Sequence, residues 1–280
     1  MKQQSIRLGI KAQAFFNTHL VPWWRAFVIA TRFLTRIPLP DPRGGAEWQG
    51  ADSGRAALLY PLVGLLLGGI LGLAVWLFSA TPAPVMATLA LIAWVWGTGA
   101  LHLDGLADCA DAWVGGLGDR GRTLEILKDP HLGVMGAVAL LLALVAKWSA
   151  LFAIATQLDS GAVGLMAVAL ALLLIPALAR AQILLLALIT PPATETGMGA
   201  ALRACLPPVP ARAVVATWWL LAGLLLGWSA LGWLALAAGL LWLWRASMRQ
   251  RLGGFTGDTA GALVEMIEVG LVLLLAAGLG

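Results

Sequence analysis

The stretch His102-Leu-Asp-Gly-Leu-Ala-Asp-Cys-Ala-Asp111 concentrates side chains that could do chemistry. Asp104, Asp108 and Asp111 are spaced i, i+4, i+7, which places them on one face of a helix. Such carboxylates repel one another, and a divalent cation relieves the repulsion; Mg²⁺ is usual where phosphates complete its shell. We therefore predict that all three are metal ligands and catalytic residues. The alternative is a solvated polar turn, but six of the chain's 14 acidic residues lie within 104–129.

A second acidic segment follows at Leu124–Gly133. Glu125 and Asp129 are four residues apart, and Lys128 lies between them. One interpretation makes Glu125 and Asp129 catalytic and Lys128 substrate-binding, all held over the first cluster. The other is a short amphipathic surface helix with a local ion pair. His102 and His131 fit an interface role more often than a ligand role.

The third candidate segment is Gly253-Gly-Phe-Thr-Gly-Asp-Thr-Ala-Gly261. A glycine-rich loop before a helix lets backbone N–H groups approach an anion. It lacks the Gly-Lys-Ser/Thr ending of a P-loop. From this segment we predict Asp258 as catalytic and Gly257 as substrate-binding. We also predict Glu265 as substrate-binding, since acids inside a membrane span tend to be functional. The alternative is a glycine-mediated helix contact.

Two cations fall inside apolar segments, Lys147 and Arg180. Each could pair with a buried acid or reach a substrate phosphate. Arg180 lies nearer the expected cytoplasmic end of its segment, where its long side chain could extend towards water. We therefore predict a substrate phosphate as its partner and leave both alternatives open for Lys147.

The elements that must position these residues are membrane helices. Hydrophobic residues make up 60% of the 280 positions and charged residues only 11%, too few to cover a water-soluble globule of this size. Seven apolar segments are long enough to span or nearly so, at 56–79, 84–101, 133–156, 161–190, 213–228, 229–244 and 260–279. The sequence thus predicts an all-α polytopic bundle of about seven transmembrane helices. No nucleic-acid partner is expected, because the basic residues are spread over membrane loops.

The distribution of basic residues predicts the orientation. Connectors at 80–83, 157–160 and near 229 contain no Lys or Arg, whereas the other connectors and the N-terminal region hold 16 of the 18 basic residues. By the positive-inside rule the charged side is cytoplasmic and Gly280 lies outside. Residues 20–39 carry three arginines, which favours an interfacial or re-entrant helix over a span. Cys109 and Cys205 are expected to be free thiols.

These features together favour Mg²⁺-assisted phosphoryl or phosphodiester transfer at the cytoplasmic face. One rival is a Mg²⁺-dependent membrane phosphotransferase that acts on a lipid alcohol. Another is an ion-coupled transporter, although transporters tend to carry internal repeats and we find none. Residues 1–25 are interpreted as an extension and 26–280 as a single membrane-embedded catalytic domain. Whether the chain forms a homo-oligomer stays open.

Five short segments, in order along the chain, resemble the cobalamin synthase family. They are Phe33-Leu-Thr-Arg-Ile-Pro-Leu-Pro40, Tyr60-Pro-Leu-Val-Gly64, Gly99-Ala-Leu-His-Leu-Asp-Gly-Leu-Ala-Asp108, Glu125-Ile-Leu-Lys-Asp129 and Gly253-Gly-Phe-Thr-Gly-Asp-Thr-Ala-Gly-Ala262. The resemblance implies a Mg²⁺-dependent adenosylcobinamide-GDP ribazoletransferase of the bacterial inner membrane. Such an enzyme joins adenosylcobinamide-GDP to α-ribazole or its 5′-phosphate and releases GMP. A ribose hydroxyl would attack the cobinamide-linked phosphorus.

Overall fold

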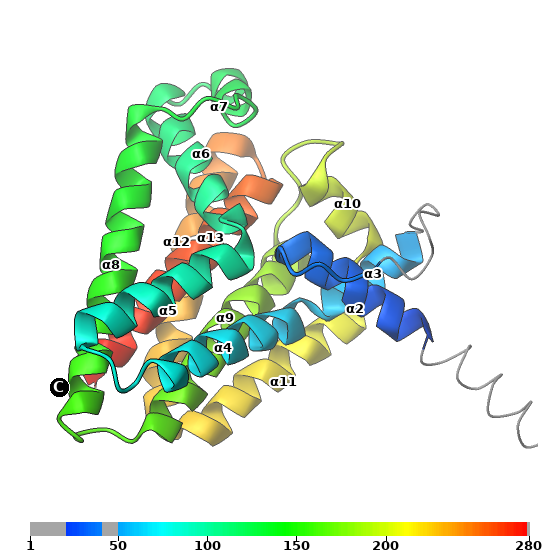
Figure 1. Ribbon diagram of the computed structural model, residues 1–280. Helices are drawn as coiled ribbons and strands as arrows, with labels where there is room; N and C mark the ends of the chain where they lie inside the picture. The colour runs from blue at the N-terminus through cyan, green and yellow to red at the C-terminus, as the bar shows by residue number, and fades with distance from the viewer. Residues whose placement is uncertain (1–20, 41–49, 279–280) are drawn as a thin grey trace, which may run out of the picture.

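The computed structural model describes residues 21–40 and 50–278. Within that part the chain forms helices and no strand longer than an isolated bridge (Figure 1). The all-α prediction is therefore confirmed. Most of the predicted N-terminal extension, 1–25, lies outside the described residues, as does Gly280.

Within the described residues, six helices are long and apolar enough to cross a membrane. They are α4 (Tyr60–Leu77), α8 (Val134–Asp159), α9 (Leu165–Ile189), α11 (Pro208–Leu226), α12 (Ser229–Leu252) and α13 (Gly257–Gly278). The chain is thus a multi-pass membrane protein. Helices α11 and α12 both extend beyond their predicted apolar segments, and α12 does so because its basic last turns, with Arg249 and Arg251, stay helical past the apolar run.

The predicted seventh span is broken. Helix α5 (Ala83–Thr98) ends at a bend of 84°, and α6 (Leu101–Gly115) continues in a new direction. Gly99 and Ala100 form the bend, with φ of 60° and 59°. Successive left-handed residues cannot continue an α-helix. The acidic cluster therefore starts on a separate helix after a sharp turn, not at the end of a straight span, and a seventh span exists only if the bent pair counts as one.

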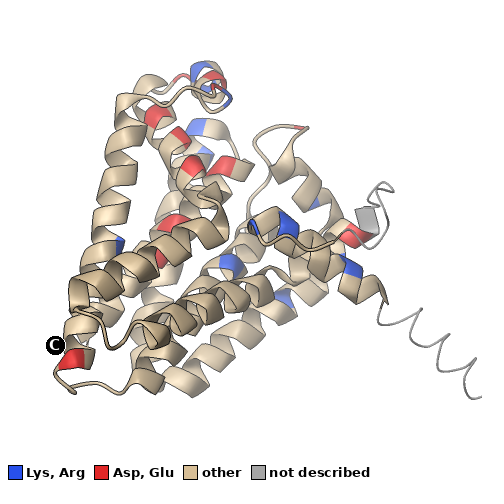
Figure 2. Cartoon of the chain, in the orientation of Figure 1, with Lys and Arg blue, Asp and Glu red and all other residues tan. Residues whose placement is uncertain are grey.

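The charged residues gather at one end of the bundle. The α4–α5, α8–α9 and α11–α12 connections lie at the same end as the end of α13 (Figure 1). Most Lys, Arg, Asp and Glu residues lie away from that end (Figure 2). This grouping agrees with the predicted sidedness.

Helix α9 is the centre of the bundle, and 78% of its apolar window is buried. Helix α4 packs against it through Gly64 and Gly68. A Cβ at Gly64 would lie 2.6 Å from the Pro176 carbonyl carbon, and one at Gly68 would lie 2.7 Å from the Leu173 Cα. Small residues four apart let membrane helices approach backbone to backbone. Pro176 lies inside α9, and the helix continues through it as one element.

Four shorter helices complete the charged end: α2 (Val21–Leu34), α3 (Gly50–Leu58), α7 (Arg120–Ile126) and α10 (Met198–Cys205). Helix α2 has 14 residues, too few to span, and it packs against α3 and α4, while α10 packs against α3 (Figure 1). Its length agrees with the interfacial or re-entrant helix that the sequence predicts.

Candidate active site

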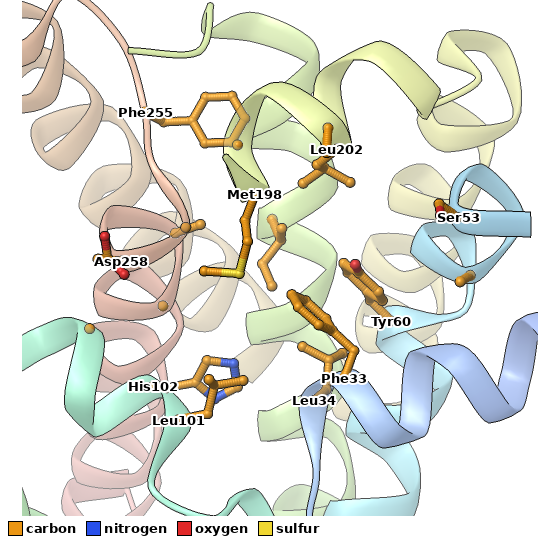
Figure 3. A pocket seen from close by; sticks show the side chains of 18 of the residues that line it. Phe33, Leu34, Ser53, Tyr60, Leu101, His102, Met198, Leu202, Phe255 and Asp258 are labelled. Carbon is orange, nitrogen blue, oxygen red and sulfur yellow. The ribbon is translucent and has the colours of Figure 1, made fainter. Parts of the chain in front are cut away.

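A cavity of about 280 Å³ opens between the short helices and the bundle. Asp104 and His102 of α6, and Gly257 and Asp258 of α13, line it together with residues of α2, α3, α4, α9 and α10 (Figure 3). Three predicted site residues, Asp104, Gly257 and Asp258, thus come together from segments about 150 positions apart.

The Asp104-Gly105 pair explains how α6 and α13 meet. A Cβ at Gly105 would lie 2.7 Å from the carbonyl oxygen of Asp258. Only glycine permits that approach of backbone to helix. The contact sets the start of α13 directly beside Asp104, which is exposed at the cavity.

The glycine-rich segment positions Asp258 through a paired strand-like contact and a helix cap. Phe255 N donates to the Pro191 carbonyl at 3.0 Å, and Ala193 N donates to the Phe255 carbonyl at 2.9 Å. Thr256 N donates to Thr259 Oγ1 at 2.8 Å, and Thr259 N donates to Thr256 Oγ1 at 3.2 Å. This reciprocal arrangement is a capping box. It fixes the first turn of α13, which carries Asp258.

Asp104, Asp108 and Asp258 form the acidic cluster near this cavity. Only Asp104 and Asp258 line it, whereas Asp108, one turn after Asp104 on α6, is half-buried and does not line it. The negative charges of Asp104, Asp258 and Asp111 repel that of Asp108, and the charge of Asp104 repels that of Asp258. No basic residue occurs between 101 and 119 to offset them. Among the described residues, however, no three His, Cys, Asp or Glu side chains converge closely enough to hold a metal ion unaided.

Asp111, predicted as the third metal ligand, has other partners in this structure. Gly133 N donates to its Oδ2 at 2.7 Å, and Gly136 N donates to its Oδ1 at 2.8 Å. These N–H groups belong to the start of α8, where intrahelical acceptors are missing. The carboxylate therefore caps α8 from a neighbouring helix, and it does not line the cavity.

Glu125, Lys128 and Asp129 are exposed on and after α7 and do not line the cavity. Glu125 pairs with Arg122 at 3.2 Å. The side chain and backbone of His131 both hydrogen-bond to Asp129, and these bonds lower the pKa of that carboxyl. The structure thus shows a surface helix with a local ion pair, as in the alternative interpretation, but its cation is Arg122 and not Lys128. Contact of these residues with substrate stays a prediction.

Arg180 and Glu265 belong to a buried ion-pair network. Glu268 receives Arg180 Nη1 on one oxygen and Lys147 Nζ, at 2.8 Å, on the other. Lys147 Nζ also lies 2.7 Å from Glu265 Oε1. Trp94 Nε1 donates to Glu268 at 2.9 Å, and its ring lies 4.3 Å from Lys147 Nζ. Two cations and two acids balance, as buried charges require.

This network departs from the prediction for Arg180. Its side chain is fully buried and does not extend to the charged surface. The reason is Glu268, one turn along α13 from Glu265, which offers the guanidinium an anion inside the bundle. Neither Arg180 nor Glu265 lines the cavity. Arg180 and Lys147 both pair with buried acids, which was the alternative to phosphate contact for each of them.

His102 is the functional candidate that the sequence interpretation underrated. Its Nδ1 lies 3.2 Å from Arg180 Nη2, and its side chain also lines the cavity. A guanidinium can only donate, so Nδ1 must accept and Nε2 carries the proton. The signal in the sequence is that His102 precedes Asp104 by only two residues. On a helix this spacing puts the two side chains on different faces, and in the structure His102 is on the buried face of α6.

The chain has close relatives among known proteins. The cobalamin-5-phosphate synthase family matches residues 26–276. An adenosylcobinamide-GDP ribazoletransferase of Pseudomonas putida is 47% identical over 263 residues, covering 92% of this chain and 99% of the relative. One of Pseudomonas aeruginosa is 46% identical, covering 90% and 98%. No solved structure matches the chain. Since the family match covers nearly the whole sequence, the chain belongs to the cobalamin-5-phosphate synthase family.

Proposed function

We propose that this protein is an adenosylcobinamide-GDP ribazoletransferase. It joins adenosylcobinamide-GDP to α-ribazole, or to α-ribazole 5′-phosphate, and gives adenosylcobalamin, or its 5′-phosphate, and GMP. Relatives that carry this name align along nearly their whole length. The observation that carries the proposal is the meeting of Asp104 and Asp258 at one cavity, beside the buried His102.

The reaction is a phosphodiester transfer that this constellation suits. A ribose hydroxyl of α-ribazole forms a new bond to the cobinamide-linked phosphorus, and the bond from that phosphorus to the bridging oxygen breaks. GMP leaves with the bridging oxygen and its electron pair. We assign Asp258 as the acceptor of the hydroxyl proton, because the capping box fixes its turn at the cavity. Because Nδ1 accepts from Arg180 and the side chain lines the cavity, we assign the Nε2–H of His102 as a donor to a phosphate oxygen.

The cofactor we propose is Mg²⁺, held by Asp104 and Asp108. Carboxylate oxygens are the ligands this ion prefers, and it usually binds through one or two of them plus substrate phosphates. A cluster without three converging ligands therefore still fits it. When bound, the ion neutralises phosphate oxygens and stabilises the leaving group. Asp111 supports this cluster by fixing α6 against α8.

We further propose that the protein lies in the bacterial inner membrane with the cavity on the cytoplasmic side. The supporting observation is the charged end of the bundle, which carries the cavity-lining short helices and α7 (Figure 2). The lipid bilayer then covers the apolar residues exposed along α8, α11 and α12, such as Leu142, Leu224 and Trp242. In this orientation Lys128, Glu125 and Asp129 are exposed on the cytoplasmic side and lie outside the cavity lining.

The test is turnover by the purified protein. Adenosylcobinamide-GDP, α-ribazole and Mg²⁺ are added to protein in detergent, and GMP and the corrinoid product are separated by chromatography. We expect equimolar GMP and adenosylcobalamin. Replacing α-ribazole by a diacylglycerol in a second reaction tests the lipid-alcohol rival. Release of GMP only with the lipid, or binding of corrinoid without any GMP, would overturn the proposal.

A further inference from the structure

The cavity has a polar end and an apolar end. Its acidic groups, Asp104 and Asp258, lie beside His102. The remaining wall is mostly apolar and comes from α2, α3, α4, α9, α10 and the loop before α13 (Figure 3). Its principal side chains are Phe33, Leu34, Tyr60, Met198, Leu202 and Phe255. A ligand that fills the cavity must therefore itself have one flat or apolar part and one polar part.

The size of the cavity restricts the ligand further. A volume of about 280 Å³ accommodates a nucleoside. It does not accommodate a corrin ring with its amide side chains. The corrinoid must then stay outside, with only its phosphate-bearing arm reaching the polar end.

The apolar end carries an aromatic wall with a polar group that no neighbour uses. Phe33 and Tyr60 stack with ring centroids 5.9 Å apart and planes at 20°. Tyr60 is only 8% exposed, and its hydroxyl makes no hydrogen bond to another described residue. The hydroxyl oxygen is not one of the fully buried polar atoms that lack a partner, and it is accessible from the cavity that Tyr60 lines. An acceptor atom of a ligand in the cavity can therefore take its hydrogen bond.

We propose that this apolar end binds the heterocyclic base of the α-ribazole acceptor, which rests on the proposed function. The base lies against Phe33 and Tyr60, and Met198 of α10 covers it from the opposite side. Its unsubstituted ring nitrogen accepts from the Tyr60 hydroxyl. The ribose then points to Asp258 and Asp104, which brings a hydroxyl to the phosphorus.

The other nucleoside in the reaction is guanosine, and the lining disfavours it. A guanine edge carries several donors and acceptors, whereas among the side chains lining the apolar end only Tyr60 and Ser53 offer polar groups. Each guanine group left unpaired there would cost binding free energy. A benzimidazole has only one acceptor nitrogen, and its remaining edge is apolar.

Two matched variants on α2 test the assignment. Phe33→Leu removes an aromatic side chain that lines the cavity, and Trp23→Leu removes one that does not. The two side chains have similar exposure, 43% and 46%. For each variant, the KM is measured for α-ribazole and for adenosylcobinamide-GDP, with the other substrate saturating. Tyr60→Phe is measured in parallel.

We expect Phe33→Leu to raise the KM for α-ribazole roughly 3- to 10-fold, the range for loss of one aromatic contact. Tyr60→Phe raises it about 2- to 10-fold, as loss of one hydrogen bond does. The KM for adenosylcobinamide-GDP stays unchanged in both, and Trp23→Leu changes neither. Free 5,6-dimethylbenzimidazole competes with α-ribazole in the wild type and loses potency in Phe33→Leu.

The outcomes separate this inference from the proposed function. If the wild type makes product but Phe33→Leu raises only the KM for adenosylcobinamide-GDP, the cavity holds guanosine or the corrinoid arm, and this inference alone fails. Unchanged KM values for both substrates in a folded Phe33→Leu protein would overturn it too. A wild type that makes no product from the two substrates overturns the proposed function.

Discussion

The guanidinium of Arg180 lies 3.2 Å from His102 Nδ1 and at the same time pairs with Glu268. This contact joins the ion pairs inside the membrane bundle to the wall of the cavity. Because Arg180 can only donate, it holds His102 in the tautomer whose proton is on Nε2. Arg180, which the sequence predicted to bind a substrate phosphate, instead contacts a histidine that lines the cavity.

Removing Arg180 should therefore cost stability first. Arg180→Ala leaves Glu268 with one cation instead of two inside the bundle, and breaking a buried pair costs about 3–5 kcal/mol. We expect the variant to melt well below the wild type in detergent. Arg212→Ala, at an exposed position on α11, is the control and should melt like the wild type. An Arg180→Ala protein of unchanged melting temperature but weak substrate affinity would restore the phosphate-contact interpretation.

Asp111 should contribute to stability because its carboxylate caps the start of α8. Asp111→Ala removes the acceptor for Gly133 N and Gly136 N, and loss of a helix cap costs about 1 kcal/mol. We expect a lower melting temperature and a partial loss of kcat, with the Mg²⁺ concentration for half-maximal activity unchanged. Asp159→Ala, at the exposed far end of α8, serves as the control. A large shift in Mg²⁺ dependence with normal stability would make Asp111 a ligand after all.

Gly105 should be intolerant of even a methyl group. In Gly105→Ala the new Cβ would lie 2.7 Å from the Asp258 carbonyl, so α6 and α13 must move apart. We expect kcat to fall at least tenfold, because a small misplacement of reacting groups is costly. Gly223→Ala on α11 meets nothing within 4 Å and should keep full activity. Equal activity of the two variants would show that the contact does not position Asp258.

The orientation can be checked with reporter fusions. A periplasm-active reporter and a cytoplasm-active reporter are inserted in turn at 80–83 and at 118–122. We expect the first position outside and the second inside, because the connectors without basic residues and those with them lie at opposite ends. If both positions report the same side, the broken α5–α6 pair does not cross the membrane.

Periodicity and composition predicted the helices well, because a membrane span leaves a long apolar signature. They did not predict the 84° bend at Gly99 and Ala100. The reason is that left-handed backbone at Ala100 depends on tertiary packing and not on its residue type.

The sequence predicted the acidic residues that line the cavity, but it did not predict which basic residues pair with the buried acids. Asp104 was predicted from the i, i+4, i+7 spacing of three acids, and Asp258 from its place in a glycine-rich segment before a helix. The pairing of Glu265 with Lys147, and of Glu268 with Arg180, depends on how α8, α9 and α13 face one another. Helical spacing gives the face of one helix, but it does not say which helix lies opposite.

Turnover by Asp104→Asn beside the wild type tests the central claim most directly. The change removes one negative charge from the acidic cluster and keeps the shape of the side chain. Asp104 is exposed at the cavity, so folding should not depend on it. We predict that GMP release from adenosylcobinamide-GDP and α-ribazole is abolished at every Mg²⁺ concentration. The melting temperature without metal should equal or slightly exceed that of the wild type, since one repelling charge has gone. A folded Asp104→Asn protein with near-normal turnover would contradict the assignment of the active site.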